Sequence, residues 1–283
     1  MCAHAFNKEG EGMRARISAR RVAAAALLFA LLAVSAAVLC AGGGGSDGRK
    51  TRSDGSLTVN VEHTGDGYIQ ARGTATSKRL KLRIKKGDEV LTYDLNGEGE
   101  YETFPLQYGS GTYTCTLYRN TSGSRYSQEG RVTVKATLND ENAPFLCANQ
   151  YVDYAGKSDV ETTAQEICAS LTTAREKYDA ICRFICTQFG FDYIGALTDK
   201  PGQLPDIEKC LSQRMGVCQD LSALTVSLLR LEGIPAKLVI GYADENYHAW
   251  VTAEVDGEEL LFDPTAELQG ISRPASYTVE RFY

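Results

Sequence analysis

The sequence predicts an α+β protein in which helices pack on an antiparallel sheet, preceded by a small all-β sandwich and an N-terminal hydrophobic helix. Short segments of alternating apolar and polar residues run from Leu57 to about Leu138 and are separated by Gly, Asn, Asp and Ser, a pattern typical of a sandwich. From Val160 onwards, apolar residues recur at helical spacing. Near the end, Asp256-Gly257 separates two further alternating segments and predicts a two-residue β-hairpin.

The first residues have the pattern of an export or anchor segment. A basic flank, residues 1–21, precedes the uncharged apolar run Val22–Ala41, which has about 20 residues and reaches the lower limit for a membrane-spanning helix. We expect an uncleaved transmembrane anchor, with cleavage as a signal peptide as the alternative and a lipid on Cys40 as a weaker one. Because a basic flank stays in the cytoplasm, the C-terminal part of the chain is expected outside the cell, membrane-anchored or secreted.

Composition narrows the classes of partner and cofactor. The chain has 283 residues, 43% of them hydrophobic, and a formal net charge of −6, so it is expected to be globular. The lack of a basic run after the N-terminal region argues against nucleic acid as a partner. The nine cysteines include no pair with zinc-finger spacing, so no metal and no cofactor is expected. Disulfides are permitted outside the cell, but free core thiols are the favoured interpretation.

Changes in composition predict where the chain divides. Residues 42–56 are rich in Gly, Ser, Asp and basic residues and are predicted to be a flexible linker. The β-sandwich domain then covers residues 57–138, and a second domain covers residues 139–283. Several lysines and arginines between Lys78 and Lys86 fall partly on the outward alternation of a strand and are interpreted as a solvated face. The functional alternative for that face is a docking surface for an anionic cell-wall polymer.

The second domain begins with predicted helices. Apolar spacing over Val160–Phe189 predicts two helices with a break near Thr172 and Thr173. Residues 191–206 are predicted to be a loop, and Ile207–Gln213 a short helix. The candidate catalytic residues follow these elements in the sequence.

Cys218 is the candidate nucleophile, and apolar residues at helical spacing after it predict that it begins a helix. The amide groups and dipole at a helix N-terminus favour a thiolate over a thiol. Asp220 in the same turn satisfies helix N-terminal donors, but its charge opposes a thiolate, so activation is expected to depend on His248. That residue is the only plausible imidazole base, because His4 and His63 lie far upstream.

The register of the predicted hairpin indicates what lies beside His248. With Asp256-Gly257 as the turn, residue pairing places Trp250 opposite Asp263 and His248 opposite Thr265. His248 and Asp263 are then diagonal neighbours on one face of the sheet. Asp263 is therefore expected to accept a ring N–H from the imidazole and to fix the tautomer that faces the nucleophile.

Taken in order and spacing, these motifs resemble the transglutaminase-like superfamily of papain-like cysteine enzymes. The motifs that carry the resemblance are Gly216-Val217-Cys218-Gln219-Asp220, Gly233-Ile234-Pro235-Ala236-Lys237, Gly241-Tyr242, His248-Ala249-Trp250 and Phe262-Asp263-Pro264-Thr265. The sandwich followed by this domain also resembles exported bacterial members with an Ig-like front module.

The resemblance implies a Cys-His-Asp triad at Cys218, His248 and Asp263 and acyl transfer through a thioester on a peptide or protein substrate. Water as the acceptor makes the protein a peptidase or deamidase, and an amine makes it a cross-linker; hydrolysis is favoured because nothing marks an amine pocket. The alternative is a catalytically idle cell-surface binding or scaffold protein with the same fold.

Two further sets of site residues are predicted. Candidates for the oxyanion donor are the backbone N–H of the nucleophile and a polar side chain upstream of it. The remaining candidates are expected to line the site. The residues concerned are Cys218, Gln213 and Tyr193 for the oxyanion, and Gln219, Asp220, Tyr247 and Trp250 for the lining.

Overall fold

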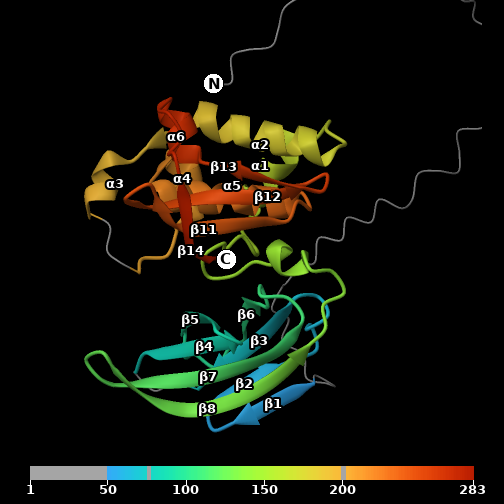
Figure 1. The fold of residues 1–283 in the computed structure, drawn as a ribbon, viewed down its shortest axis with the longest axis vertical. Helices are drawn as coiled ribbons and strands as arrows, with labels where there is room; N and C mark the ends of the chain where they lie inside the picture. Colours follow the sequence, from blue (N-terminus) through green and yellow to red (C-terminus); the bar gives the residue numbers. More distant parts are fainter. Residues whose placement is uncertain (1–49, 75–77, 199–201) are drawn as a thin grey trace, which may run out of the picture. The chain divides into compact units, whose positions relative to one another are not determined.

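The first eight strands are antiparallel and form two four-stranded sheets (Figure 1). The computed structural model describes residues 50–74, 78–198 and 202–283. One sheet has the strand order β1-β2-β3-β6 and the other β5-β4-β7-β8. Their bounds are β1 Thr51–Asp54, β2 Leu57–Asn60, β3 Tyr68–Gly73, β4 Leu80–Lys86, β5 Glu89–Leu95, β6 Glu102–Pro105, β7 Gly111–Ser122 and β8 Arg125–Ala136.

The period-2 pattern of these strands places one face of each sheet in a common core. In β4, Leu80, Leu82 and Ile84 are buried while the residues between them are exposed or half-buried. A Cβ on Gly73 of the first sheet would lie 2.9 Å from Leu95 and 3.1 Å from Leu117 of the second. The antiparallel all-β module predicted from the alternation is therefore observed, whereas its likeness to an Ig domain stays a prediction.

Strand β1 lies inside the segment that was predicted to be a flexible linker. Thr51–Asp54 pairs with Leu57–Asn60 in an antiparallel ladder, and Gly55 turns the chain between them at φ +55°. Backbone hydrogen bonding therefore orders Thr51–Asp54, the part of the predicted linker that forms β1. The predicted basic flank and apolar run, residues 1–41, lie outside the described residues. Within the described ranges, no helix combines the length and apolarity needed to cross a membrane.

Two helices follow the short 3₁₀ turn η1 (Ala143–Leu146), as predicted from the apolar spacing. They are α1 (Ser158–Cys168) and α2 (Ala174–Gln188), and the break falls where the sequence placed it. Thr173 caps α2: its hydroxyl accepts from the Glu176 amide, and the Glu176 carboxylate accepts from the Thr173 amide. This reciprocal pair satisfies donors that the helix itself leaves free.

The segment predicted to be a loop contains short elements. Gly190–Phe191 forms β9, which pairs in parallel with β10 (Met215–Gly216), and residues Tyr193–Thr198 form helix α3. The prediction was wrong here because Asp192 caps α3: its Oδ1 accepts from the amides of Ile194 and Gly195. The short helix α4 has the predicted bounds, Ile207–Gln213.

The last sheet has the order β13-β12-β11-β14 and is antiparallel. Helix α5 (Cys218–Leu231) packs against its strands β11 and β12, and its side chains from Leu221 to Arg230 are buried. The strand bounds are β11 Ala236–Ala243, β12 Asn246–Val255, β13 Glu258–Phe262 and β14 Tyr277–Phe282, with α6 (Pro264–Gln269) between the last two. This half of the chain runs from yellow to red in Figure 1.

Buried Arg230 at the end of α5 holds β14 in place. Its guanidinium donates to the carbonyl oxygens of Ala236, Cys147 and Tyr283. The side chain is 4% exposed, so these carbonyls replace the water that a buried cation loses. The strand that carries Tyr277 is thereby attached to the helix that begins at Cys218.

Candidate active site

Cys218 is the first residue of α5, as the sequence predicted. The parallel bridge between β9 and β10 brings the chain to this point, and Val217 is the helix N-cap. Gly216 allows the approach: a Cβ there would lie 2.8 Å from the Cys210 Sγ and 2.9 Å from the Asp220 Cβ. Cys218 is half-buried, so its thiol is placed at the start of a helix with partial access to solvent.

Asp220 has a structural role in this turn. Its Oδ2 accepts from the Val217 amide at 3.2 Å, and its Oδ1 accepts from the Asp206 amide at 3.2 Å. Both contacts fix the segments that lead to Cys218, consistent with the expectation that this carboxylate satisfies helix N-terminal donors.

A buried side chain connects helix α5 to β12, the strand that carries His248. Ser222, one turn after Cys218, is fully buried, and its hydroxyl donates to the Ala249 carbonyl at 3.2 Å. His248 is directly opposite Gly241 on β11. The imidazole is therefore held by the sheet and by α5 together.

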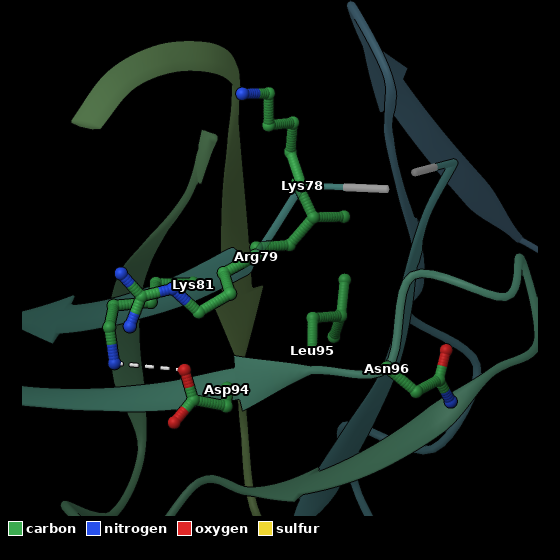
Figure 2. Close-up of a pocket in the computed structure, with 7 residues that line it drawn as sticks. Lys78, Arg79, Lys81, Asp94, Leu95 and Asn96 are labelled. Atoms are coloured by element: carbon green, nitrogen blue, oxygen red, sulfur yellow. Dashed lines mark hydrogen bonds and ion pairs between the residues drawn. The ribbon is translucent and has the colours of Figure 1, made fainter. Parts of the chain in front are cut away.

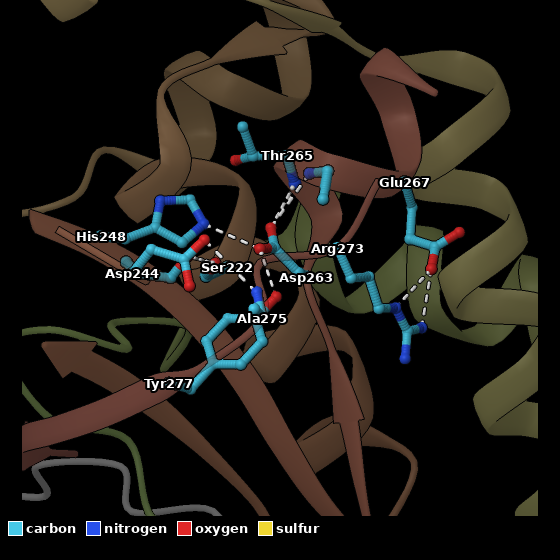
Figure 3. A network of polar contacts seen from close by, with 11 residues as sticks. Ser222, Asp244, His248, Asp263, Thr265, Glu267, Arg273, Ala275 and Tyr277 are labelled. Atoms are coloured by element: carbon cyan, nitrogen blue, oxygen red, sulfur yellow. Dashed lines mark hydrogen bonds and ion pairs between the residues drawn. The ribbon is translucent and has the colours of Figure 1, made fainter. Parts of the chain in front are cut away.

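The imidazole and the Asp263 carboxylate are in direct contact (Figure 3). His248 Nε2 lies 2.9 Å from Asp263 Oδ2, and the two side chains are 13% and 1% exposed. The other carboxylate oxygen, Oδ1, accepts from the amides of Thr265 and Ala266, so Asp263 is also the N-cap of α6. Helix capping and the imidazole contact together orient this buried carboxylate.

The predicted pairing is right up to Phe262 and wrong beyond it. The ladder runs from Val255↔Glu258 to Val251↔Phe262, which is the register that the Asp-Gly turn predicted. Asp263 is not paired with Trp250, and Thr265 is not paired with His248. Pro264 is the reason, because it begins α6 and ends the strand. The expected contact between His248 and Asp263 is nevertheless present.

The contacts of His248 with Asp263 and Cys218 favour the protonated form of its imidazole. Burial alone would lower the pKa of His248, but hydrogen bonds and charges of Asp263 and Cys218 outweigh it and raise the pKa from 6.5 to about 9. Burial would raise the pKa of Asp263, yet contacts with His248, the Ala266 amide and Tyr277 hold it below its ordinary value. Because Nε2 faces Asp263, the ring leaves Nδ1 for the thiol of Cys218.

The raised pKa of His248 predicts a pH-dependent contribution to stability. A group whose pKa rises on folding stabilises the protein fully below its unfolded value, near 6.5, and loses this effect as the pH passes about 9. We expect the difference in unfolding free energy between wild type and His248→Gln to shrink by on the order of 3 kcal/mol from pH 6 to pH 10. Urea unfolding at both pH values measures it, and a difference that grows with pH would contradict the assignment.

Tyr277 is a member of this group that the sequence did not reveal. Its hydroxyl donates to Asp263 Oδ2 at 2.9 Å, the oxygen that also faces His248, and its ring packs 5.0 Å from that of buried Trp250. Asp244 fixes the chain just before it by accepting from the Ala275 and Ser276 amides (Figure 3). The alternation after residue 276 indicates a strand, but not that β14 pairs with distant β11 across a bulge.

Removing the Tyr277 hydroxyl is expected to weaken the site without unfolding it. Asp263 loses one donor, so its pKa rises and the acid limb of the pH–rate profile moves to higher pH. A hydrogen bond to a charged group contributes about 1.5 kcal/mol, so we expect Tyr277→Phe to lower kcat for an activated ester roughly 10-fold, with KM little changed. Tyr154→Phe, which loses a hydroxyl contact to the Leu146 carbonyl, is the control. An unchanged pH profile in Tyr277→Phe would contradict this role.

The family model of the Transglutaminase-like superfamily matches residues 161–264, the segment that contains Cys218, His248 and Asp263. Residues 161–264 are a transglutaminase-like domain.

Solved structures that match this chain include a "putative cysteine protease" from Cytophaga hutchinsonii, 16% identical, with a TM-score of 0.40 over 80% of this chain and 82% of that one. The periplasmic domain of TgpA from Pseudomonas aeruginosa, bound to ethylmercury, is 15% identical, with a TM-score of 0.38 over 78% and 77%. Red sea bream transglutaminase is 13% identical, with a TM-score of 0.29 over 70% and 47%. No curated protein matches the sequence.

The remaining predicted site residues of the transglutaminase-like domain differ in their environments. The Tyr193 side chain is exposed, and its hydroxyl donates to Gln269 Oε1 at 2.9 Å, so this donor is already engaged. Gln213 is exposed at the end of α4. The Gln219 amide donates to the Gln203 carbonyl. Tyr247 is 53% exposed, and its hydroxyl accepts from Arg281.

None of the seven cysteines that the structure describes forms a disulfide. Among the described residues, no group of three His, Cys, Asp or Glu side chains is arranged to hold a metal ion. Cys182 and Cys186 lie on one helix, α2, as the sequence spacing indicated.

Proposed function

We propose that the chain is a cysteine acyl-transfer enzyme in which Cys218 is the nucleophile, His248 the acid–base group and Asp263 the orienting carboxylate. One observation carries the proposal: the imidazole of His248 interacts with both Cys218 and Asp263, and the nucleophile begins a helix. A cysteine with an adjacent base that is oriented by a third group is the arrangement used for covalent acyl transfer.

The proposed reaction has two halves. The Cys218 thiol gives its proton to His248, and the thiolate attacks the carbonyl carbon of a peptide or side-chain amide. The imidazolium then protonates the departing amine or ammonia as the C–N bond breaks, which leaves a thioester on the sulfur. In the second half, neutral His248 removes a proton from the acceptor, the acceptor attacks the thioester, and the proton returns to the thiolate.

Water is the favoured acceptor, so a peptidase or deamidase is proposed over a cross-linking enzyme. Cys218 is half-buried and water can reach it, whereas no residue of the described site marks a pocket for an amine. The backbone N–H of Cys218 is the favoured oxyanion donor, because the first amides of a helix have no intrahelical acceptor. The engaged hydroxyl of Tyr193 fits this role less well.

The proposed site of action is outside the cytoplasm. The support is the basic flank followed by the apolar run Val22–Ala41, which is expected to anchor or export the chain. In this proposal the sandwich is an Ig-like front module on the extracytoplasmic side, and the substrate is a peptide or protein of that compartment.

One panel of assays distinguishes water from an amine as the acceptor and also tests the alternative of a catalytically idle binding module. We expect casein incubated with the protein to yield new amino termini or ammonia in larger amounts than incorporation of a fluorescent primary amine. Cys218→Ala should abolish every product. Amine incorporation that exceeds both hydrolytic products would replace the hydrolase by a transamidase. No product, together with iodoacetamide labelling of Cys218 no faster than of the other cysteines, would leave the catalytically idle binding module.

A further inference from the structure

One face of the second sandwich sheet carries a continuous row of cations. Every outward position of β4 and of the residue before it is basic, from Arg79 through Lys81 and Arg83 to Lys85. Alternate residues of a strand lie about 7 Å apart on the same face. Two strands away on the same face, β8 contributes exposed Arg131 and Lys135. We call these six side chains the cationic face.

The charges of the cationic face are only partly neutralised. Lys81 binds Asp94 at 2.9 Å, and Arg79 donates to the Gly123 carbonyl. Among the described residues, no carboxylate forms an ion pair with the remaining four members of the face, which are Arg83, Lys85, Arg131 and Lys135. The whole chain, by contrast, has a formal net charge of −6. The face is therefore a local positive region on an acidic protein.

Fold stability does not explain this arrangement. Lysine at a sheet edge prevents edge-to-edge association, but β4 is an inner strand, between β5 and β7. The only acid among its outward neighbours in the described ladder is Asp94, opposite Lys81. Arg83 is opposite Thr92 on one side and Thr116 on the other, and Lys85 is opposite Val90 and Thr114. Like charges on one strand repel, and lysine is a poor strand former. A ligand that neutralises them would remove that cost.

We propose that the cationic face binds an acidic polysaccharide, a linear sugar polymer with repeated carboxylates. Regularly spaced cations match repeated anions, and exposed Thr92 beside Arg83 can hydrogen-bond to a sugar hydroxyl. Single-stranded nucleic acid fits less well, because its binding depends on exposed aromatic rings. The tyrosines of this face, Tyr118 and Tyr126, are half-buried.

A pocket gives one end of the face a defined shape. It has a volume of about 450 Å³ and is lined by Lys78, Arg79 and Lys81, with Asp94 and Asn96 opposite (Figure 2). A polymer that follows β4 therefore meets Lys78 and Arg79 at this end, beside the Lys81–Asp94 ion pair. The site is independent of the proposed chemistry at Cys218.

Binding to polygalacturonate tests the proposal. We expect the full chain to bind immobilised polygalacturonate, to release it as salt rises, and to bind the methyl-esterified polymer at least 10-fold more weakly, because esterification removes the charge and keeps the sugar chain. The double variant Arg83→Gln/Lys85→Gln should weaken binding about 10-fold or more. Arg183→Gln/Lys209→Gln is the matched control, because it removes one exposed arginine and one exposed lysine of the other domain; less than a 2-fold change is expected.

Each alternative has its own outcome. Equal loss in the two double variants would show attraction by overall charge and would overturn the site. Tighter binding to oligodeoxythymidylate or to phosphatidylglycerol vesicles than to polygalacturonate would overturn the polysaccharide assignment. Because the substituted side chains are exposed, matching thermal unfolding of the variants and the wild type checks that the fold is retained. Cys218→Ala should bind the polymer as the wild type does.

Discussion

Replacing His248 by asparagine is expected to remove the reactivity of Cys218. In the proposed reaction, the imidazole of His248, whose pKa is raised to about 9, accepts the proton of the Cys218 thiol. An unassisted cysteine is only a few per cent thiolate at pH 7, so alkylation of Cys218 by iodoacetamide should slow on the order of 30-fold. Turnover of an activated ester should fall by about 10³-fold or more, because proton transfer to and from the acceptor is lost as well.

The other thiols of the same chain provide the internal control. Half-buried Cys182 and Cys186 lie on α2 and are not placed in the proposed chemistry, so their labelling rates should be the same in wild type and variant. Peptide mapping after brief alkylation separates the sites. Cys218 labelling that is as fast in His248→Asn as in the wild type would show that this imidazole does not activate the thiol.

The second large effect is expected for Asp263→Asn. The side-chain oxygen of asparagine can still accept from the Thr265 and Ala266 amides, so the cap of α6 is retained. The negative charge that supports the imidazolium is lost, which lowers the pKa of His248 and allows the wrong tautomer. We expect ester turnover to fall by roughly 10³- to 10⁴-fold, with little change in the temperature of unfolding.

Asp263→Ala distinguishes orientation from capping. It removes the carboxylate from both the imidazole and α6, so it should lose activity as Asp263→Asn does and also lose about 1 kcal/mol of stability from the cap. Thermal unfolding and ester turnover of the two variants measure both effects. Activity retained in Asp263→Asn and lost only in Asp263→Ala would reduce the role of Asp263 to that of a cap.

Local patterns in the sequence were sufficient for much of the candidate site. The helix that begins at Cys218 follows from the spacing of apolar residues, and the register of β12 and β13 follows from the two-residue turn at Asp256-Gly257. Both patterns depend on neighbours in the chain. The contact between His248 and Asp263 could therefore be expected from the amino-acid sequence, although Pro264 ends the strand earlier than the pattern suggested.

Distant contacts account for what the sequence did not reveal. Tyr277 reaches Asp263 because β14 pairs with β11, more than 30 residues earlier, and a bulge beside Gly241 shifts that register. Strand β1 is ordered by pairing with β2, although its own composition is polar. In each case the hydrogen-bonding partner, rather than the segment itself, determines the conformation.

Detection of the thioester tests the central claim most directly. The wild-type protein would be incubated briefly with p-nitrophenyl acetate, quenched in acid and digested, and the acetylated peptides identified by mass spectrometry. The proposed chemistry predicts an acetyl group on Cys218 that disappears from the wild type when the quench is delayed until the ester has been consumed, and that does not form in His248→Asn. Acetylation spread over Cys182, Cys186 and Cys218 alike, or equal acetylation of Cys218 in the variant, would contradict it.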